Sequence, residues 1–170
     1  MFEIGDKINY GINGVCTLEG VRREKIGRET HEYYVLRPVM QSRSTICVPV
    51  DNAALVAKMM PLVSREELDA LIRELPDLPA GWIENDLERT QEFKRILRTA
   101  DRRSIFSVIK SIYAHEKELN AQNRHLKNSD QEIMKEAEAI LYHEFAQVLS
   151  IRPEEVLPYL IARIENADPS

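Results

Sequence analysis

The chain has 170 residues, of which 44% are hydrophobic and 30% are charged, and its formal net charge at pH 7 is -5. This composition excludes wholesale disorder, and the length suits two small modules. The N-terminus lacks a secretory signal and no apolar segment reaches the roughly 20 residues that span a bilayer. We therefore expect a cytoplasmic protein without a membrane partner.

The first fifty residues read as strands. The segments FEIGDKINY, VCTLEGVRREK, EYYVLRPV and STICVPV are short and rich in β-branched and aromatic residues, and turn residues such as Asn13-Gly14 and Gly27 separate them. Four or five such strands predict a small twisted barrel, which is too small to enclose a substrate pocket and is typical of an interaction module. Cys16 and Cys47 have no metal-ligand spacing, so we expect no metal site.

After Asp51 the apolar residues no longer alternate with polar ones and instead recur every three or four positions, which is typical of helices. A capping box at residues 64–67 precedes one helix, which Pro76 and Pro79 end. Further helices are predicted from about Ile83 to Arg98, after the N-cap Asp101, from a second capping box at residues 129–132, and after Pro153. The predicted inward residues of the second and third helices include Ile83, Leu87, Phe93, Ile105 and Tyr113. The fold class is thus α+β, with a barrel domain over residues 1–60 and a helical domain of about five helices over residues 61–170.

The charge is unevenly distributed along the chain. Between Phe93 and Lys110 six basic residues accompany the single acidic residue Asp101, whereas acidic residues dominate from Ser129 onward. A basic stretch in an acidic chain can bind phosphates locally while the remaining surface is repelled.

Motifs of catalysis are missing from the sequence. There is no HExxH, GxSxG, Walker A or Rossmann glycine pattern, and the four histidines share no metal-ligand spacing. We expect no enzyme, no cofactor and no small-molecule substrate.

The only tryptophan, Trp82, lies between a Pro/Gly break and the basic stretch. A large aromatic residue at a helix entrance either packs into the core or is presented to a partner. The residues alone leave both interpretations open. The Pro79-Ala80-Gly81 approach favours an exposed ring, with Ile83, Leu87 and Phe93 forming the buried face without it.

The segments "MFEIGDKINYGINGVCTLEGV", "EYYVLRPV" and "STICVPVDNA" resemble the N-terminal domain of the CarD family of bacterial transcription regulators, which is related to the polymerase-interacting module of the transcription-repair coupling factor. The resemblance continues through Trp82, the step at Ala100-Asp101, the basic helix and "AEAILYHEFAQVL", and it covers nearly the whole chain. It implies a Tudor-like barrel that binds the β subunit of RNA polymerase. It also implies a helical domain that contacts promoter DNA at the upstream edge of the transcription bubble and stabilises the open complex.

The resemblance implies roles for individual residues. Trp82 matches the tryptophan that wedges into the minor groove at the upstream fork, where an aromatic ring can fill an unstacked base step. The cations predicted to contact phosphates are Arg89, Lys94, Arg95, Arg98, Arg102, Arg103, Lys110, Arg124 and Lys127. The predicted polymerase contacts are Arg22, Lys25 and Ile26 of one hairpin and Arg43, Thr45 and Cys47 of one strand, through addition of a strand to a sheet edge.

This sequence also departs from the family pattern. The acidic stretch Ile83-Glu84-Asn85-Asp86 follows the tryptophan where a basic pair and an aromatic are common, Cys47 lies where an arginine is often found, and Glu24 replaces a cation.

Two alternative functions from other classes stay open. One is a helix-turn-helix repressor that reads DNA with "LSIRPEEVLPYLIARI", although that stretch is acidic. The other is a protein-only adaptor whose basic helix contacts an acidic partner.

Overall fold

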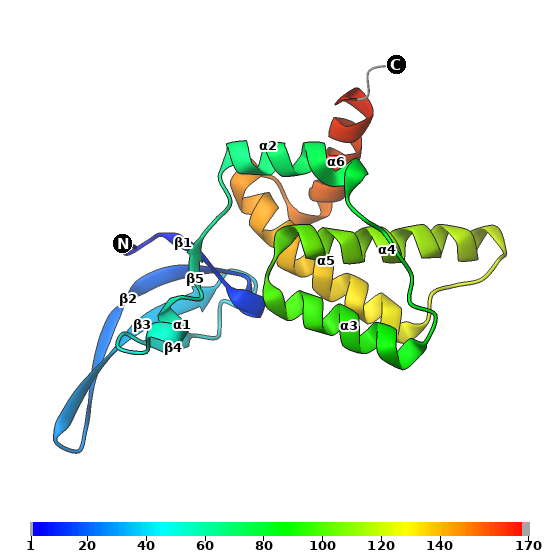
Figure 1. Cartoon of the computed structure of the whole chain (residues 1–170). Helices are drawn as coiled ribbons and strands as arrows, with labels where there is room; N and C mark the ends of the chain where they lie inside the picture. The colour runs from blue at the N-terminus through cyan, green and yellow to red at the C-terminus, as the bar shows by residue number, and fades with distance from the viewer. Residues whose placement is uncertain (1, 168–170) are drawn as a thin grey trace. The chain divides into compact units, whose positions relative to one another are not determined.

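The computed structural model describes residues 2–167. The chain divides into two compact units, Met1–Leu62 and Val63–Ser170, with the boundary two residues beyond the predicted one. The first unit is built of strands and the second of helices (Figure 1), so the predicted α+β class is confirmed.

The N-terminal unit is one antiparallel sheet of five strands in the order β4-β3-β2-β1-β5. Its strands are β1 (Lys7–Tyr10), β2 (Val15–Ile26), β3 (Glu29–Pro38), β4 (Ile46–Pro49) and β5 (Met59–Pro61). Gly14 and Gly27 have φ of 72° and 66°, a left-handed conformation that turns the chain tightly before and after β2. The first four strands match the predicted ones. The fifth has no counterpart among the four predicted segments, because Met-Met-Pro shows no alternation of apolar and polar residues.

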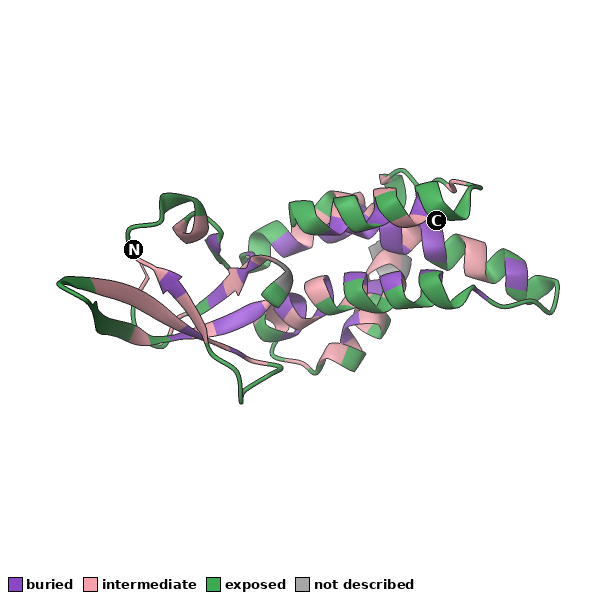
Figure 2. Cartoon of the chain, turned by 90° about the horizontal axis from the view of Figure 1, so that it is seen from below, coloured by how far each residue is buried: buried purple, intermediate pink, exposed green. Residues whose placement is uncertain are grey.

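The sheet curls around a small core in which Ile8, Leu18, Leu36 and Val48 are buried. A register shift between Leu18 and Gly20 forms a bulge in β2, and the β2–β3 hairpin continues well past it. Residues 21–30 are all exposed, which Figure 2 shows at the free end of the hairpin. The short helix α1 (Ala53–Val56) follows β4 and is capped by Asn52.

Over its described residues, the C-terminal unit contains five α-helices, namely α2 (Arg65–Glu74), α3 (Asp86–Thr99), α4 (Arg102–Ala121), α5 (Asn128–Leu149) and α6 (Pro153–Ala167). Side-chain caps begin three of them: Ser64, Asn85 and Asp101 each accept a hydrogen bond from the backbone N–H three residues later. The prediction of a capping box at residues 129–132 is wrong, because α5 already begins at Asn128, one residue before Ser129. Pro158 lies inside α6.

The helices pack around a core that includes Leu68, Phe93, Ile105 and Phe145. Figure 2 shows buried residues as bands along these helices, with exposed residues on their other sides. The prediction that Leu87 faces inward is wrong, since its side chain is 67% exposed. The buried row of α3 runs through Arg89, Phe93 and Leu97, and a residue two positions from that row points to the opposite side of a helix.

Tyr113 was also predicted to be buried but is 39% exposed, because it lies at the edge of the α4 face formed by Ile105, Ile109 and Ile112. None of the helices in the described part of the chain is long and apolar enough to cross a membrane.

Candidate functional site

Residues 76–85, which we call the strap, join α2 to α3 without regular structure over most of their length. The first half is held by α4: the Nζ atom of Lys110 donates to the carbonyl oxygens of Pro76 and Leu78 at 2.8 and 2.7 Å. The Oγ atom of Ser111 then accepts the N–H of Gly81 at 3.0 Å. The second half is held by α3, since Arg89 donates to the carbonyl oxygen of Ile83 at 2.9 Å. Lys110 thus has a structural role that competes with the predicted phosphate contact.

Trp82 lies between these two sets of hydrogen bonds and is half-buried against the helical core. Its indole stacks on the ring of His115, with 3.8 Å between the ring centroids and 12° between the planes. The guanidinium of Arg89 lies 4.4 Å from the indole centroid, and Phe93 meets the indole edge-on at 6.2 Å. The prediction of an exposed ring is therefore corrected to a half-buried one, because the strap folds the indole back onto α3 and α4.

Arg89 is only 2% exposed and is paired on several sides. It donates from two nitrogens to both carboxylate oxygens of Asp130, each at 2.9 Å, and to Asp86 at 2.9 Å. Burial by itself lowers the pKa of Arg89, but the hydrogen bonds to the two aspartates outweigh it and the pKa is raised. The predicted phosphate contact of Arg89 is thus corrected, since the guanidinium is already used inside the helical unit.

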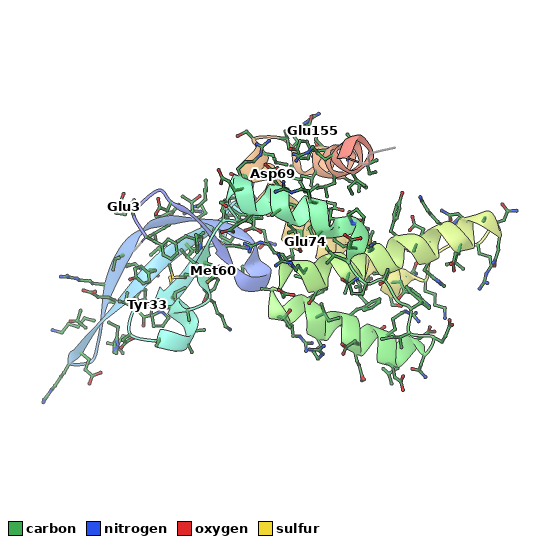
Figure 3. All side chains as sticks on the ribbon, turned by 45° about the horizontal axis from the view of Figure 1, so that its top comes forward. Glu3, Tyr33, Met60, Asp69, Glu74 and Glu155 are labelled. Atoms are coloured by element: carbon green, nitrogen blue, oxygen red, sulfur yellow. The ribbon has the colours of Figure 1, made fainter. Side chains whose placement is uncertain are left out.

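The cations at the start of α4 also have internal partners. Arg102 makes two hydrogen bonds to Glu144, the first at 2.7 Å, and Glu144 is fully buried. Glu144 also accepts the N–H of Val63 at 3.0 Å. Arg103 donates to Glu74 of α2 at 3.0 Å, and Figure 3 labels this carboxylate. These partners explain why two arginines occur at a helix start, where the helix dipole disfavours cations.

Besides Arg103, five predicted cations are exposed on the surface. Arg95 pairs with Glu92 and Lys127 pairs with Asp86, whereas Lys94, Arg98 and Arg124 have no ion pair or side-chain hydrogen bond among the described residues. Arg124 and Lys127 line a pocket of about 210 Å³ together with Trp82. The structure thus places two predicted cations beside the indole. The pocket also contains the carboxylates of Glu84, Asp86 and Asp130, so this surface has both signs of charge.

On the N-terminal unit, two of the six predicted polymerase contacts meet. Nη2 of Arg22 donates to Sγ of Cys47 at 3.0 Å, across the intervening strand β3, and Arg22 also pairs with Glu24 at 3.2 Å. Cys47 belongs to β4, which ends the sheet. Lys25 and Ile26 are exposed near the end of the hairpin.

Arg43 and Thr45 are exposed and lie in the loop before β4, which begins at Ile46. The prediction that both belong to the strand is therefore wrong.

Comparison with known protein families identifies the type of domain that the N-terminal sheet forms. Residues 2–60 match the family model of the CarD-like/TRCF RID domain. The N-terminal unit is a CarD-like RNA polymerase-interacting domain. The match confirms the resemblance that the first strands indicate, and it ends before α2 begins. No curated protein matches the chain.

Within the CarD-like unit, the edge strand β4 offers backbone groups that pair with no other strand of the sheet. Its neighbour β3 contributes Tyr33, which Figure 3 labels and which lies opposite both Arg22 of β2 and Pro49 of β4. A sheet edge without a neighbouring strand is what strand addition requires.

The structure adds three site residues that the sequence did not indicate, namely His115, Asp130 and Glu144. Each lies on a helix distant in sequence from its partner, and a single sequence carries no signal of such pairs. Asp130 and Glu144 read as surface carboxylates in an acidic segment, yet they are 2% and 0% exposed.

Proposed function

We propose that this chain is a transcription regulator that binds the β subunit of RNA polymerase through its CarD-like unit and promoter DNA through its helical unit. It stabilises the open promoter complex, and it acts by binding without catalysing a reaction. The observation that carries the proposal is the CarD-like/TRCF RID domain over residues 2–60, in which β4 is a free sheet edge.

Support for DNA binding comes from the helical unit. Trp82 is a half-buried aromatic residue on an irregular segment, with Arg124 and Lys127 beside it. Contact between an aromatic ring and an unstacked base contributes about 1 to 3 kcal/mol. Since about 1.4 kcal/mol changes an equilibrium tenfold, one such contact is enough to change the occupancy of an open complex.

Binding to the β subunit is tested by two matched variants of the full chain. Thr45→Glu places a carboxylate beside the free edge of β4, and Met60→Glu places one on β5, at the other end of the sheet. Figure 3 labels Met60 and shows it on a different strand from Tyr33. We expect Thr45→Glu to abolish co-elution with the purified β subunit and Met60→Glu to preserve it, with equal thermal unfolding of both variants as the control.

If the wild-type chain does not co-elute with the β subunit, the proposal is wrong at its first step. If both variants co-elute equally well, the β subunit binds elsewhere than at the β4 edge.

A further inference from the structure

We propose that His115 is a positioning residue for Trp82, which holds the indole in the orientation that enters DNA. The inference rests on the proposed function, because it assigns to His115 the task of presenting the DNA-contacting ring. The observation behind it is the parallel stack of the two rings, with 3.8 Å between centroids and 12° between planes.

The strap is fastened by its backbone on both sides of Trp82. Lys110 and Ser111 of α4 hold the residues before the indole, and Arg89 of α3 holds the carbonyl oxygen that follows it. These hydrogen bonds fix the path of the main chain but leave the side-chain torsions of Trp82 free. The ring needs contacts of its own to adopt one orientation.

Among the described residues, three side chains make aromatic or cation–π contacts with the ring, and His115 is the one with no ion pair or hydrogen bond to the strap and no place in the buried core. Phe93 is 5% exposed and belongs to the helical core. Arg89 also holds the strap and pairs with Asp130. Apart from the indole, His115 contacts only Glu118 among the described ion pairs and hydrogen bonds, at 4.0 Å between Nδ1 and Oε2. Removing its imidazole therefore frees the ring without releasing the strap or opening the core.

A ring held in one orientation binds with less loss of conformational entropy than a mobile one. The charged groups around this stack are Glu118 of α4, Arg89 and Asp86 of α3, Asp130 of α5, Glu84 of the strap, and Arg124 and Lys127 around the α4–α5 loop, so charges of both signs surround the ring.

The stack can be measured without polymerase, because Trp82 is the only tryptophan and reports alone in intrinsic fluorescence. We expect the fluorescence anisotropy of Trp82 in the full chain to fall in His115→Ala, because an indole released from the stack moves independently of the protein. His125→Ala is the matched control, since His125 lines the same pocket without stacking on Trp82, and it should keep the wild-type anisotropy. An anisotropy that His115→Ala leaves unchanged would overturn the proposal.

The second measurement is the lifetime of the open promoter complex, with full-length His115→Ala, His115→Phe and Trp82→Ala. We expect His115→Ala to shorten the lifetime by about two- to tenfold, the range for reordering one side chain. His115→Phe should restore it, because a flat phenyl ring can stack in the same place. A lifetime that Trp82→Ala shortens and His115→Ala leaves unchanged or lengthens would contradict the positioning role. If Trp82→Ala has no effect either, the proposed function fails and not only this inference.

Discussion

Arg89 illustrates how a residue in a basic segment can serve the fold instead of a nucleic acid. Its guanidinium is 2% exposed and its partner Asp130 is 2% exposed, so both charges have lost almost all contact with water. Such a pair is costly to break, because removal of one partner leaves the other as an unpaired buried charge.

We predict that Arg89→Ala and Asp130→Ala each lower the free energy of unfolding by about 3 to 5 kcal/mol, measured by urea denaturation. Arg98→Ala is the control, because Arg98 lies on the same helix, is exposed and has no ion pair among the described residues. It should change the free energy of unfolding by no more than about 0.5 kcal/mol. Equal effects of Arg89→Ala and Arg98→Ala would show that the pair is not buried in solution.

For single residues, roles that depend on near neighbours in the sequence could be predicted better than burial, which depends on distant segments. The caps Ser64 and Asp101 could be predicted, because a cap and the N–H that it accepts are three residues apart. The burial of Arg89 could not, because it depends on Asp130, which is 41 residues away. The half-buried state of Trp82 likewise depends on His115, which lies on the distant helix α4.

Among the elements, the α4–α5 interface brings together acidic side chains that repel one another when they are ionised. Burial raises the pKa of Glu138, and the nearby negative charge of Glu116 raises it further. Burial also raises the pKa of Tyr142, with a contribution from Glu138. A carboxyl group with a raised pKa in the folded state keeps its proton longer there than in the unfolded chain. Its ionisation therefore destabilises the fold as the pH rises above the ordinary value of 4.5.

We predict that Glu138→Gln stabilises the protein at pH 7 relative to wild type, and that this advantage shrinks as the pH falls towards 4.5. Thermal unfolding of both proteins between pH 4 and 8 gives the comparison. Glu136→Gln, an exposed change on the same helix, should show no such trend. A Glu138→Gln advantage that is constant over this pH range would speak against a raised pKa.

Element types could be predicted from hydrophobic period and turn residues, and the first four strands and the helices α2 to α6 confirm this. Element ends were less predictable. The helix predicted from Ile83 begins at Asp86, because Asn85 provides the cap and Arg89 draws the preceding residues back into the strap. β5 forms because it pairs with β1, and its own three residues do not indicate a strand.

For the whole molecule, the internal pairing of cations limits how strongly DNA can be attracted. Only Lys94, Arg98 and Arg124 of the predicted phosphate contacts have no partner among the described residues. The helical unit therefore presents fewer available cations than its sequence indicates, on a chain with a formal net charge of -5.

We predict weak, sequence-tolerant DNA binding by the full chain, with a slope of about -3 in log K against log salt concentration for three released counterions. Fluorescence anisotropy with labelled duplexes of two unrelated sequences measures both properties. A slope of about -6 or steeper would mean that the internal ion pairs open to bind phosphates, and tight binding to one duplex would favour a sequence-specific repressor.

The proposed function is tested most directly by the decay of open promoter complexes formed by RNA polymerase with and without the full chain, after addition of a competitor. We expect the wild-type chain to lengthen the lifetime about tenfold, and Trp82→Ala to lose this effect while still binding polymerase through its CarD-like unit. Because Trp82 is half-buried, Trp82→Ala also lowers stability, by about 2 kcal/mol, so the assay is run well below its melting temperature. A wild-type chain that binds polymerase but leaves the decay unchanged would contradict the proposal.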